Sequence, residues 1–170
     1  MILKSLLLGL LSLSSCGLLA CRQVEVRITD AQVEGKEPGE ILLRFRLDHD
    51  VEDLGNSRSM GYLTVRDQRP SVERTDRVHW HAVATLQEVP GRRTGETLEY
   101  VCQFPLTADR EGSYYYYGLD GKLASLYVES PYTLTRPGDH SLEFYVACGG
   151  CGFFVTGVHS EAVTLTYRRP

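Results

Sequence analysis

The sequence lacks the cluster of basic residues that marks a nucleic-acid-binding protein. Its longest basic runs are the pairs Arg92-Arg93 and Arg168-Arg169, and 18 basic residues stand against 22 acidic ones, a formal net charge of −4. Phosphate backbones are recognised mainly through clustered positive charge. We therefore expect no nucleic-acid partner.

The short motifs of common active sites are also missing. The chain contains no G-x-S-x-G nucleophile elbow, no H-E-x-x-H metal motif and no glycine-rich phosphate loop. Serine, histidine and aspartate residues are present, but no spacing groups them into a recognisable constellation. We expect a protein that is not an enzyme and that carries no cofactor.

Only the N-terminus carries a long apolar run. Lys4 precedes the apolar stretch 6–13, which is too short to cross a bilayer and ends in small residues. This arrangement is typical of a secretory signal peptide. No second run of 18 apolar residues follows, so the remainder of the chain is not expected to enter a bilayer.

The stretch Leu18-Leu19-Ala20-Cys21 resembles the lipobox of bacterial lipoproteins. The resemblance implies that residues 1–20 are a signal peptide and that Cys21 becomes a diacylated N-terminus. Acyl chains such as palmitate would then anchor the protein in a membrane of the cell envelope. Because Arg22 rather than an aspartate follows, the sorting rule of that family points to the outer membrane.

A second match to the same motif leaves the lipidated residue open. Leu13-Ser14-Ser15-Cys16 also ends in a cysteine after a small residue. We favour Cys21, because cleavage before Cys16 would shorten the signal and discard the apolar Gly17-Leu18-Leu19. The remaining alternatives are a secretory signal without lipid, cut near Ala20, and an uncleaved anchor.

Residues 21–170 have the size of one domain, and apolar and polar residues alternate through most of them. Alternation with period two predicts strands that bury one face. The expected inward rows are Val24, Val26 and Ile28; Ile41, Leu43, Phe45 and Leu47; Leu63 and Val65; Val78, Trp80, Ala82, Ala84 and Leu86; Leu98, Tyr100, Cys102 and Phe104; His140, Leu142, Phe144 and Val146; and Val163, Leu165 and Tyr167.

Eight or nine short strands without a convincing helix predict an all-β fold, an antiparallel β-sandwich or barrel. Segments 137–146 and 160–166 resemble the closing strand pair of bacterial immunoglobulin-like domains, which implies an immunoglobulin-like β-sandwich. The cysteine pair and the buried tryptophan of antibody domains are not reproduced. Only the architecture is therefore expected to carry over.

Four consecutive tyrosines, Tyr114–Tyr117, precede Asp120-Gly121. This pattern predicts a hairpin with a two-residue turn, and a return strand over 122–129 for which a short helix is the alternative. Two arrangements of the rings are open. Either two of them point outward as a contact surface, or one pair lies in the core and the other packs across the strands, which we favour.

The segment Cys148-Gly149-Gly150-Cys151 allows three interpretations. A redox dithiol requires a helix start, whereas strand-forming residues 153–156 follow; a zinc ribbon requires a second C-x-x-C. We favour a disulfide between Cys148 and Cys151 in an oxidising compartment. Cys102 then stays a buried free thiol, although its pairing with a loop cysteine is the alternative.

His79 and His81 flank Trp80 at a spacing that places both imidazoles on one face of a strand. With Trp80 directed inward, both should face solvent. Strand-borne Zn and Cu sites use this spacing, although two ordinary surface histidines are the interpretation we favour.

We therefore predict an envelope-anchored lipoprotein that acts as a non-catalytic binding or structural module. Its partner would be an unidentified envelope protein, a glycan or a host surface, besides the membrane that holds its lipid. The alternative is a periplasmic Zn- or Cu-binding protein that uses His79 and His81, with or without the Cys148/Cys151 loop.

Overall fold

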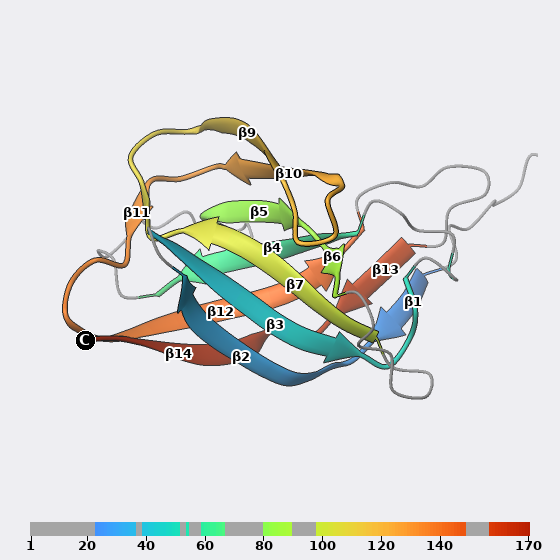
Figure 1. Cartoon of the computed structure of the whole chain (residues 1–170). Coiled ribbons are helices and arrows are strands. Elements are labelled where there is room, and N and C mark those ends of the chain that lie inside the picture. The colour runs from blue at the N-terminus through green and yellow to red at the C-terminus, as the bar shows by residue number, and fades with distance from the viewer. Residues whose placement is uncertain are drawn as a thin grey trace, which may run out of the picture.

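The computed structural model describes residues 23–36, 39–51, 54, 59–66, 80–89, 98–148 and 157–170. Over these residues the chain forms fourteen strands, arranged in two larger sheets and one short ribbon (Figure 1). No helix is present in the described part of the chain. The all-β prediction is confirmed, and face-to-face sheets fit a sandwich.

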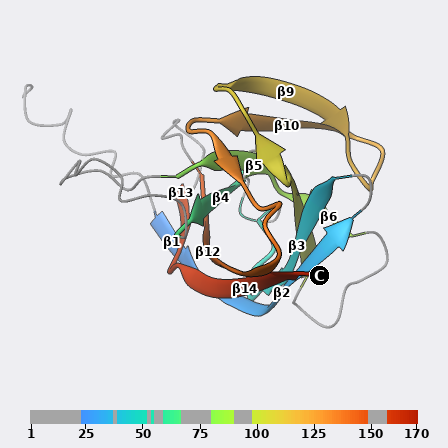
Figure 2. The same cartoon turned by 90° about the vertical axis from the view of Figure 1, so that its left-hand side faces the viewer.

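The larger sheet has eight strands in the order β1-β13-β12-β4-β5-β10-β9, with β14 also paired to β12. All its pairs are antiparallel except β1 with β13. Figure 2 places the β9–β10 hairpin on the side of the molecule opposite β14. The strands are β1 (Gln23–Val26), β4 (Met60–Val65), β5 (Ala82–Thr85), β9 (Gly112–Tyr117), β10 (Leu123–Val128), β12 (Gly138–Ala147), β13 (Gly157–Ser160) and β14 (Val163–Arg169).

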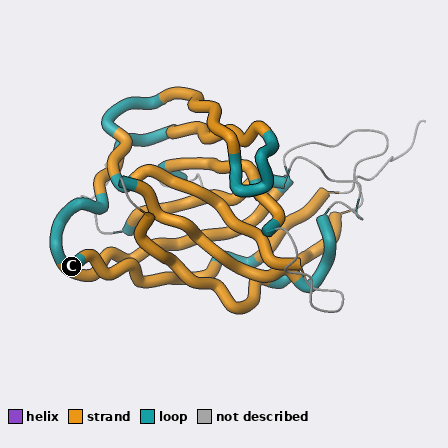
Figure 3. Tube along the Cα trace, viewed as in Figure 1, coloured by secondary structure: helices purple, strands orange, loops and turns teal. Residues whose placement is uncertain are grey.

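The second sheet has the order β2-β3-β7-β6, and a two-stranded ribbon joins β8 to β11. Figure 3 shows how little of the described chain lies outside these strands. The strands are β2 (Ile28–Lys36), β3 (Glu40–Leu47), β6 (Gln87–Glu88) and β7 (Leu98–Pro105), with β8 (Thr107–Ala108) and β11 (Tyr132–Thr133) in the ribbon.

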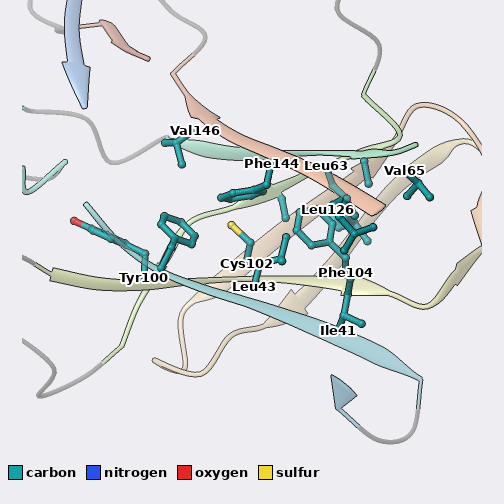
Figure 4. Packing of buried hydrophobic residues seen from close by; sticks show 14 of the residues in the cluster. Ile41, Leu43, Leu63, Val65, Tyr100, Cys102, Phe104, Leu126, Phe144 and Val146 are labelled. Carbon is teal, nitrogen blue, oxygen red and sulfur yellow. The ribbon is translucent and has the colours of Figure 1, made fainter. Parts of the chain in front are cut away.

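The core lies between the two sheets and is built from the expected inward rows of β3, β7 and β12 (Figure 4). Phe45 of one sheet meets Phe144 of the other with ring centroids 5.0 Å apart. Cys102 is fully buried beside them, as its place in the inward row predicted. Period-two alternation therefore identified the core correctly along these strands.

The strand count exceeds the predicted eight or nine because β8, β11 and β13 were not expected, and because the chain switches sheets within two segments expected to be continuous. The first breaks at Arg27, whose N–H donates to Asp48 Oδ1 at 2.8 Å, so β1 and β2 join different sheets. The second breaks at Leu86, between β5 of the larger sheet and β6 of the smaller. Such crossings form the corners of a sandwich, and alternation alone does not reveal them.

The inward placement predicted for Trp80 is wrong. Its ring is half-buried and packs edge-on against Tyr62 at 5.2 Å, on the face of β4 opposite the core residue Leu63. Residues 80 and 81 precede β5, so strand alternation does not govern them. Ala82 and Ala84, which are within β5, do point inward.

Gly61 in β4 sets the spacing of the sheets, because a Cβ atom there would lie 2.6 Å from both Cys102 Sγ and Phe144 Cε2. Overpacking of this kind costs about 1–3 kcal/mol. We predict that Gly61→Ala lowers the free energy of unfolding by about that amount in a urea titration. The loss should be smaller in a Cys102→Ala background; equal losses in the two backgrounds would contradict this account.

Candidate functional site

The sites predicted from sequence fall partly outside the described residues. Cys16, Cys21, His79 and Cys151 lie outside, so the lipid attachment and the Cys148–Cys151 disulfide stay predictions. His81, Cys102 and Cys148 are described.

His81 is half-buried rather than solvent-facing, which corrects the expectation for this residue. Its Nδ1 accepts a hydrogen bond from the backbone N–H of Val65 at 3.2 Å, and its ring lies edge-on to Tyr132. An imidazole that accepts through Nδ1 carries its proton on Nε2. In this state neither nitrogen offers a lone pair to a metal ion, so the observed His81 has a structural role.

His81 and Cys148 lie at opposite ends of β4. His81 donates its N–H to the Leu63 carbonyl at 2.7 Å, whereas Cys148 follows Ala147, which pairs with Met60 at the other end. The length of β4 is roughly 20 Å at 3.3 Å per residue. The described residues contain no group of three His, Cys, Asp or Glu side chains that could hold a metal ion.

Cys102 is a free thiol, so it does not pair with a loop cysteine. Its Sγ lies 3.8 Å from the carbonyl oxygen of Thr85, and burial raises the pKa of this thiol far above its ordinary value. A thiol that stays protonated is neither a nucleophile nor a metal ligand. Cys102 therefore acts as a core residue.

Two of the four tyrosines belong to an exposed face of the β9–β10 hairpin. Tyr115 and Tyr117 are 71% and 80% exposed, while Tyr114 and Tyr116 pack against the core from the other side of β9. One pair therefore lies against the core, as in the arrangement that we favoured, and the other points outward, as in the alternative. We call this surface, which also includes neighbours on β10, the hairpin face: Tyr115, Tyr117, Leu123 and Tyr127.

The hairpin connection is longer than the predicted two-residue turn. It spans residues 118–122, closed by hydrogen bonds from Gly118 N–H to the Lys122 carbonyl and from Gly121 N–H to the Gly118 carbonyl. Gly121 takes φ +73°, the left-handed region that favours glycine. The Asp120-Gly121 signal located the turn correctly, although not its length.

A buried amide, Gln87, fastens the hairpin to the second sheet. Gln87 Oε1 accepts the Leu119 N–H at 2.8 Å, and Nε2 donates to the Tyr116 hydroxyl at 3.1 Å. Burial raises the pKa of the Tyr116 hydroxyl, which lies near the Gln103 backbone. A Cβ atom on Gly118 would overlap Gln87 Oε1, so a side chain here would displace the Gln87 amide from these hydrogen bonds.

A groove of about 580 Å³ runs between this hairpin and the end of β7. Its apolar lining comes from Phe104, Ala108, Leu126 and Val128, and its polar lining includes Glu40, Asp109 and Arg110. Three consecutive residues of β9, Tyr114–Tyr116, also line it. A cavity of this size that combines apolar walls with several polar groups is suited to binding.

A row of aromatic rings crosses the outer face of the larger sheet. Tyr62 stacks on Tyr145 with centroids 4.7 Å apart, and Trp80 and His159 flank the pair. Sequence reasoning missed this row, although Tyr62 and Tyr145 occupy solvent-facing positions of their strands. The stacked faces of Tyr62 and Tyr145 stabilise this surface of the sheet.

Comparison with known proteins found no family model that matches the chain. No curated protein matches it either. Among the described residues, no helix is long and apolar enough to cross a membrane.

The hydrogen bond between the Tyr116 hydroxyl and the Gln87 amide should contribute measurably to the free energy of unfolding. Tyr116→Phe would leave the buried Gln87 amide without its acceptor, so we predict a loss of about 1–3 kcal/mol of unfolding free energy in urea. The matched change Tyr115→Phe removes an exposed hydroxyl and should stay within about 0.5 kcal/mol. Equal losses for the two variants would show that Tyr116 does not fasten the hairpin.

Stability at alkaline pH should depend on Tyr145. Burial, and then the nearby Tyr62 and Glu129, raise the pKa of Tyr145 to about 12. An unfolded tyrosine ionises near about pH 10, so this residue's stabilising contribution is complete below that pH and is lost between about pH 10 and 12. Unfolding free energies measured across this window should fall less steeply for Tyr145→Phe than for the unchanged chain. Parallel curves would refute the assignment.

Proposed function

We propose that the chain is a non-catalytic binding module, held at the cell envelope by a lipid on Cys21 and built on a β-sandwich. The signal-like N-terminus and the lipobox resemblance support the anchor. The first strand of the sandwich, β1, begins at Gln23, so only Arg22 would separate the lipidated residue from the folded domain. Such a short tether keeps the module at the membrane surface.

The exposed hairpin face is the observation that carries the binding role. Tyr115, Tyr117 and Leu123 are all more than 60% exposed on one side of the hairpin, while Gln87 holds the hairpin rigidly from the other. Tyrosines on a rigid element offer a large contact area at low cost in conformational entropy. Gathered apolar side chains of this kind mark interaction sites.

We also propose that the sandwich is of the immunoglobulin-like kind. The pairing of β12 with β14, which runs from Gly138 opposite Arg169 to Phe144 opposite Val163, supports this. These strands are the two segments whose sequences resemble a closing immunoglobulin-like pair. The metal-binding alternative receives no such support, because the hydrogen bond to Val65 occupies His81 Nδ1.

The anchor is tested by labelling cells with radioactive palmitate and separating their membranes. We expect the unchanged chain to incorporate label and to sediment with the outer membrane. Cys21→Ser should lose the label and leave the membrane fraction, because no acylated residue remains to hold it. Cys16→Ser is the matched control and should behave as the unchanged chain; loss of label in that variant would move the anchor to Cys16.

A further inference from the structure

Two strand edges lie beside the groove, that of β7 in the second sheet and that of β9 in the larger sheet. They differ in whether their backbone groups are available for pairing. On β7, Glu99 accepts the Val89 N–H, so the odd-numbered residues of this strand direct their backbone groups toward β6. Past the end of β6, the Tyr116 hydroxyl lies near the Gln103 backbone, and Pro105 has no N–H to offer. The border of β7 is thus closed against further pairing.

The border of β9 is open. Gly118 donates its N–H to the Lys122 carbonyl, which makes the even-numbered residues of β9 the hydrogen-bonded partners of β10. The N–H and C=O groups of Ser113, Tyr115 and Tyr117 therefore point away from β10. Among the described strands, β9 pairs with β10 alone.

The sequence of β9 contains none of the usual protections of an edge strand. The strand reads Gly-Ser-Tyr-Tyr-Tyr-Tyr, without lysine, proline or any charged residue, and its register with β10 is continuous. Aromatic residues favour extended structure, and a flat uncharged edge is a template for another strand.

The groove follows this same border. Successive residues of a strand point to opposite faces, yet Tyr114, Tyr115 and Tyr116 all line the groove. A cavity lined by residues from both faces of β9 lies along the backbone edge of that strand. A strand paired to β9 would therefore direct every second side chain toward Phe104, Leu126 and Val128.

We propose that β9 binds an extended segment of a partner protein, which adds a strand to the larger sheet and places alternate apolar side chains in the groove. This inference rests on the proposed function, that the chain is a binding module, and it assigns the binding to the backbone edge of β9 rather than to the rings of the hairpin face. Backbone pairing supplies affinity in this mode of recognition, and pockets for alternate side chains supply selectivity. A glycan has no regular series of donors and acceptors to match three N–H and three C=O groups at two-residue spacing.

The charges around the groove favour a segment flanked by basic residues. Glu40 and Asp109 line the groove and Glu111 precedes β9, while the whole chain carries a net charge of −4. Arg110 also lines the groove and keeps its positive charge while it donates to the Tyr114 hydroxyl at 3.4 Å, and Lys36 pairs with Glu40 at 3.4 Å, so these groups together leave a small negative excess. Complementary charge speeds encounter and excludes acidic competitors.

A second copy of this chain fits the border less well than a partner segment. In an antiparallel β9–β9 pair, the inward residues of the copy would be Tyr114 and Tyr116, whose hydroxyls are already bonded to Arg110 and Gln87 of their own chain. Pairing two six-residue strands buries on the order of a few hundred Å². Stable interfaces bury about 1,200–2,000 Å².

The probes are ten-residue peptides in which threonine alternates with leucine, phenylalanine or tyrosine, with a lysine at each end. They are titrated into the full mature chain carrying Cys21→Ser, while amide hydrogen exchange is followed by NMR. We expect exchange at Ser113, Tyr115 and Tyr117 to slow by at least about tenfold. The amides of Tyr114 and Tyr116, already bonded to β10, should change little. Peptides ending in glutamate should bind more weakly.

Two variants at one position separate the backbone edge from the hairpin face. Tyr115→Pro removes an outward N–H that the hairpin does not use, so the fold should persist while peptide affinity falls at least about tenfold. Tyr115→Ser removes the exposed ring but keeps the N–H, and its affinity should fall less than about threefold.

Three results would overturn the proposal: no probe binding at about 1 mM, equal losses in the two variants, or a concentration-dependent dimer in sedimentation that Tyr115→Pro abolishes. The last would assign the border to a second copy of the chain. Because the measurement uses an unlipidated chain, its failure is independent of the palmitate result that tests the anchor.

Discussion

The buried amide of Gln87 determines what the hairpin can do. It lies just after the chain leaves the larger sheet at β5 and enters the smaller one at β6, and from there it holds both Leu119 and Tyr116. A buried amide with satisfied donors and acceptors is rigidifying, because each bond broken would leave a polar group without water. These hydrogen bonds therefore fix the separation between the hairpin and β7. The groove occupies the space that this separation leaves.

Because Gln87 fixes the hairpin beside β7, one of the two neighbouring strand edges is covered and the other is open to pairing. The Tyr116 hydroxyl lies near the Gln103 backbone, so a side chain of the hairpin itself covers this part of the β7 edge. The hairpin in turn exposes its own border at Ser113, Tyr115 and Tyr117. Natural sheets usually protect such edges, and an unprotected edge next to an apolar groove fits a binding role. The tether at Cys21 would place this edge where envelope proteins are concentrated.

Much of the fold could be predicted from the sequence. Period-two alternation identified the inward rows of β3, β7 and β12, because each of these strands stays within one sheet along its whole length. It failed at Trp80, which lies before β5, and it did not reveal the change of sheet at Leu86, although the Leu86 side chain does pack against the core. The candidate site was predicted in part: four tyrosines beside a turn were evident, but which pair points outward depends on which side the second sheet covers.

The sequence by itself determined the strand-forming segments, the burial of Cys102, the hairpin at Asp120-Gly121 and the signal-like N-terminus, since these depend on neighbouring residues and their alternation. Only the tertiary structure decided that His81 is held by Val65 far from Cys148, that Gln87 supports the hairpin, and that β9 is an open border while β7 is a closed one. These are contacts between residues distant in the chain, and whether a backbone edge is paired depends on every other strand in the sheet.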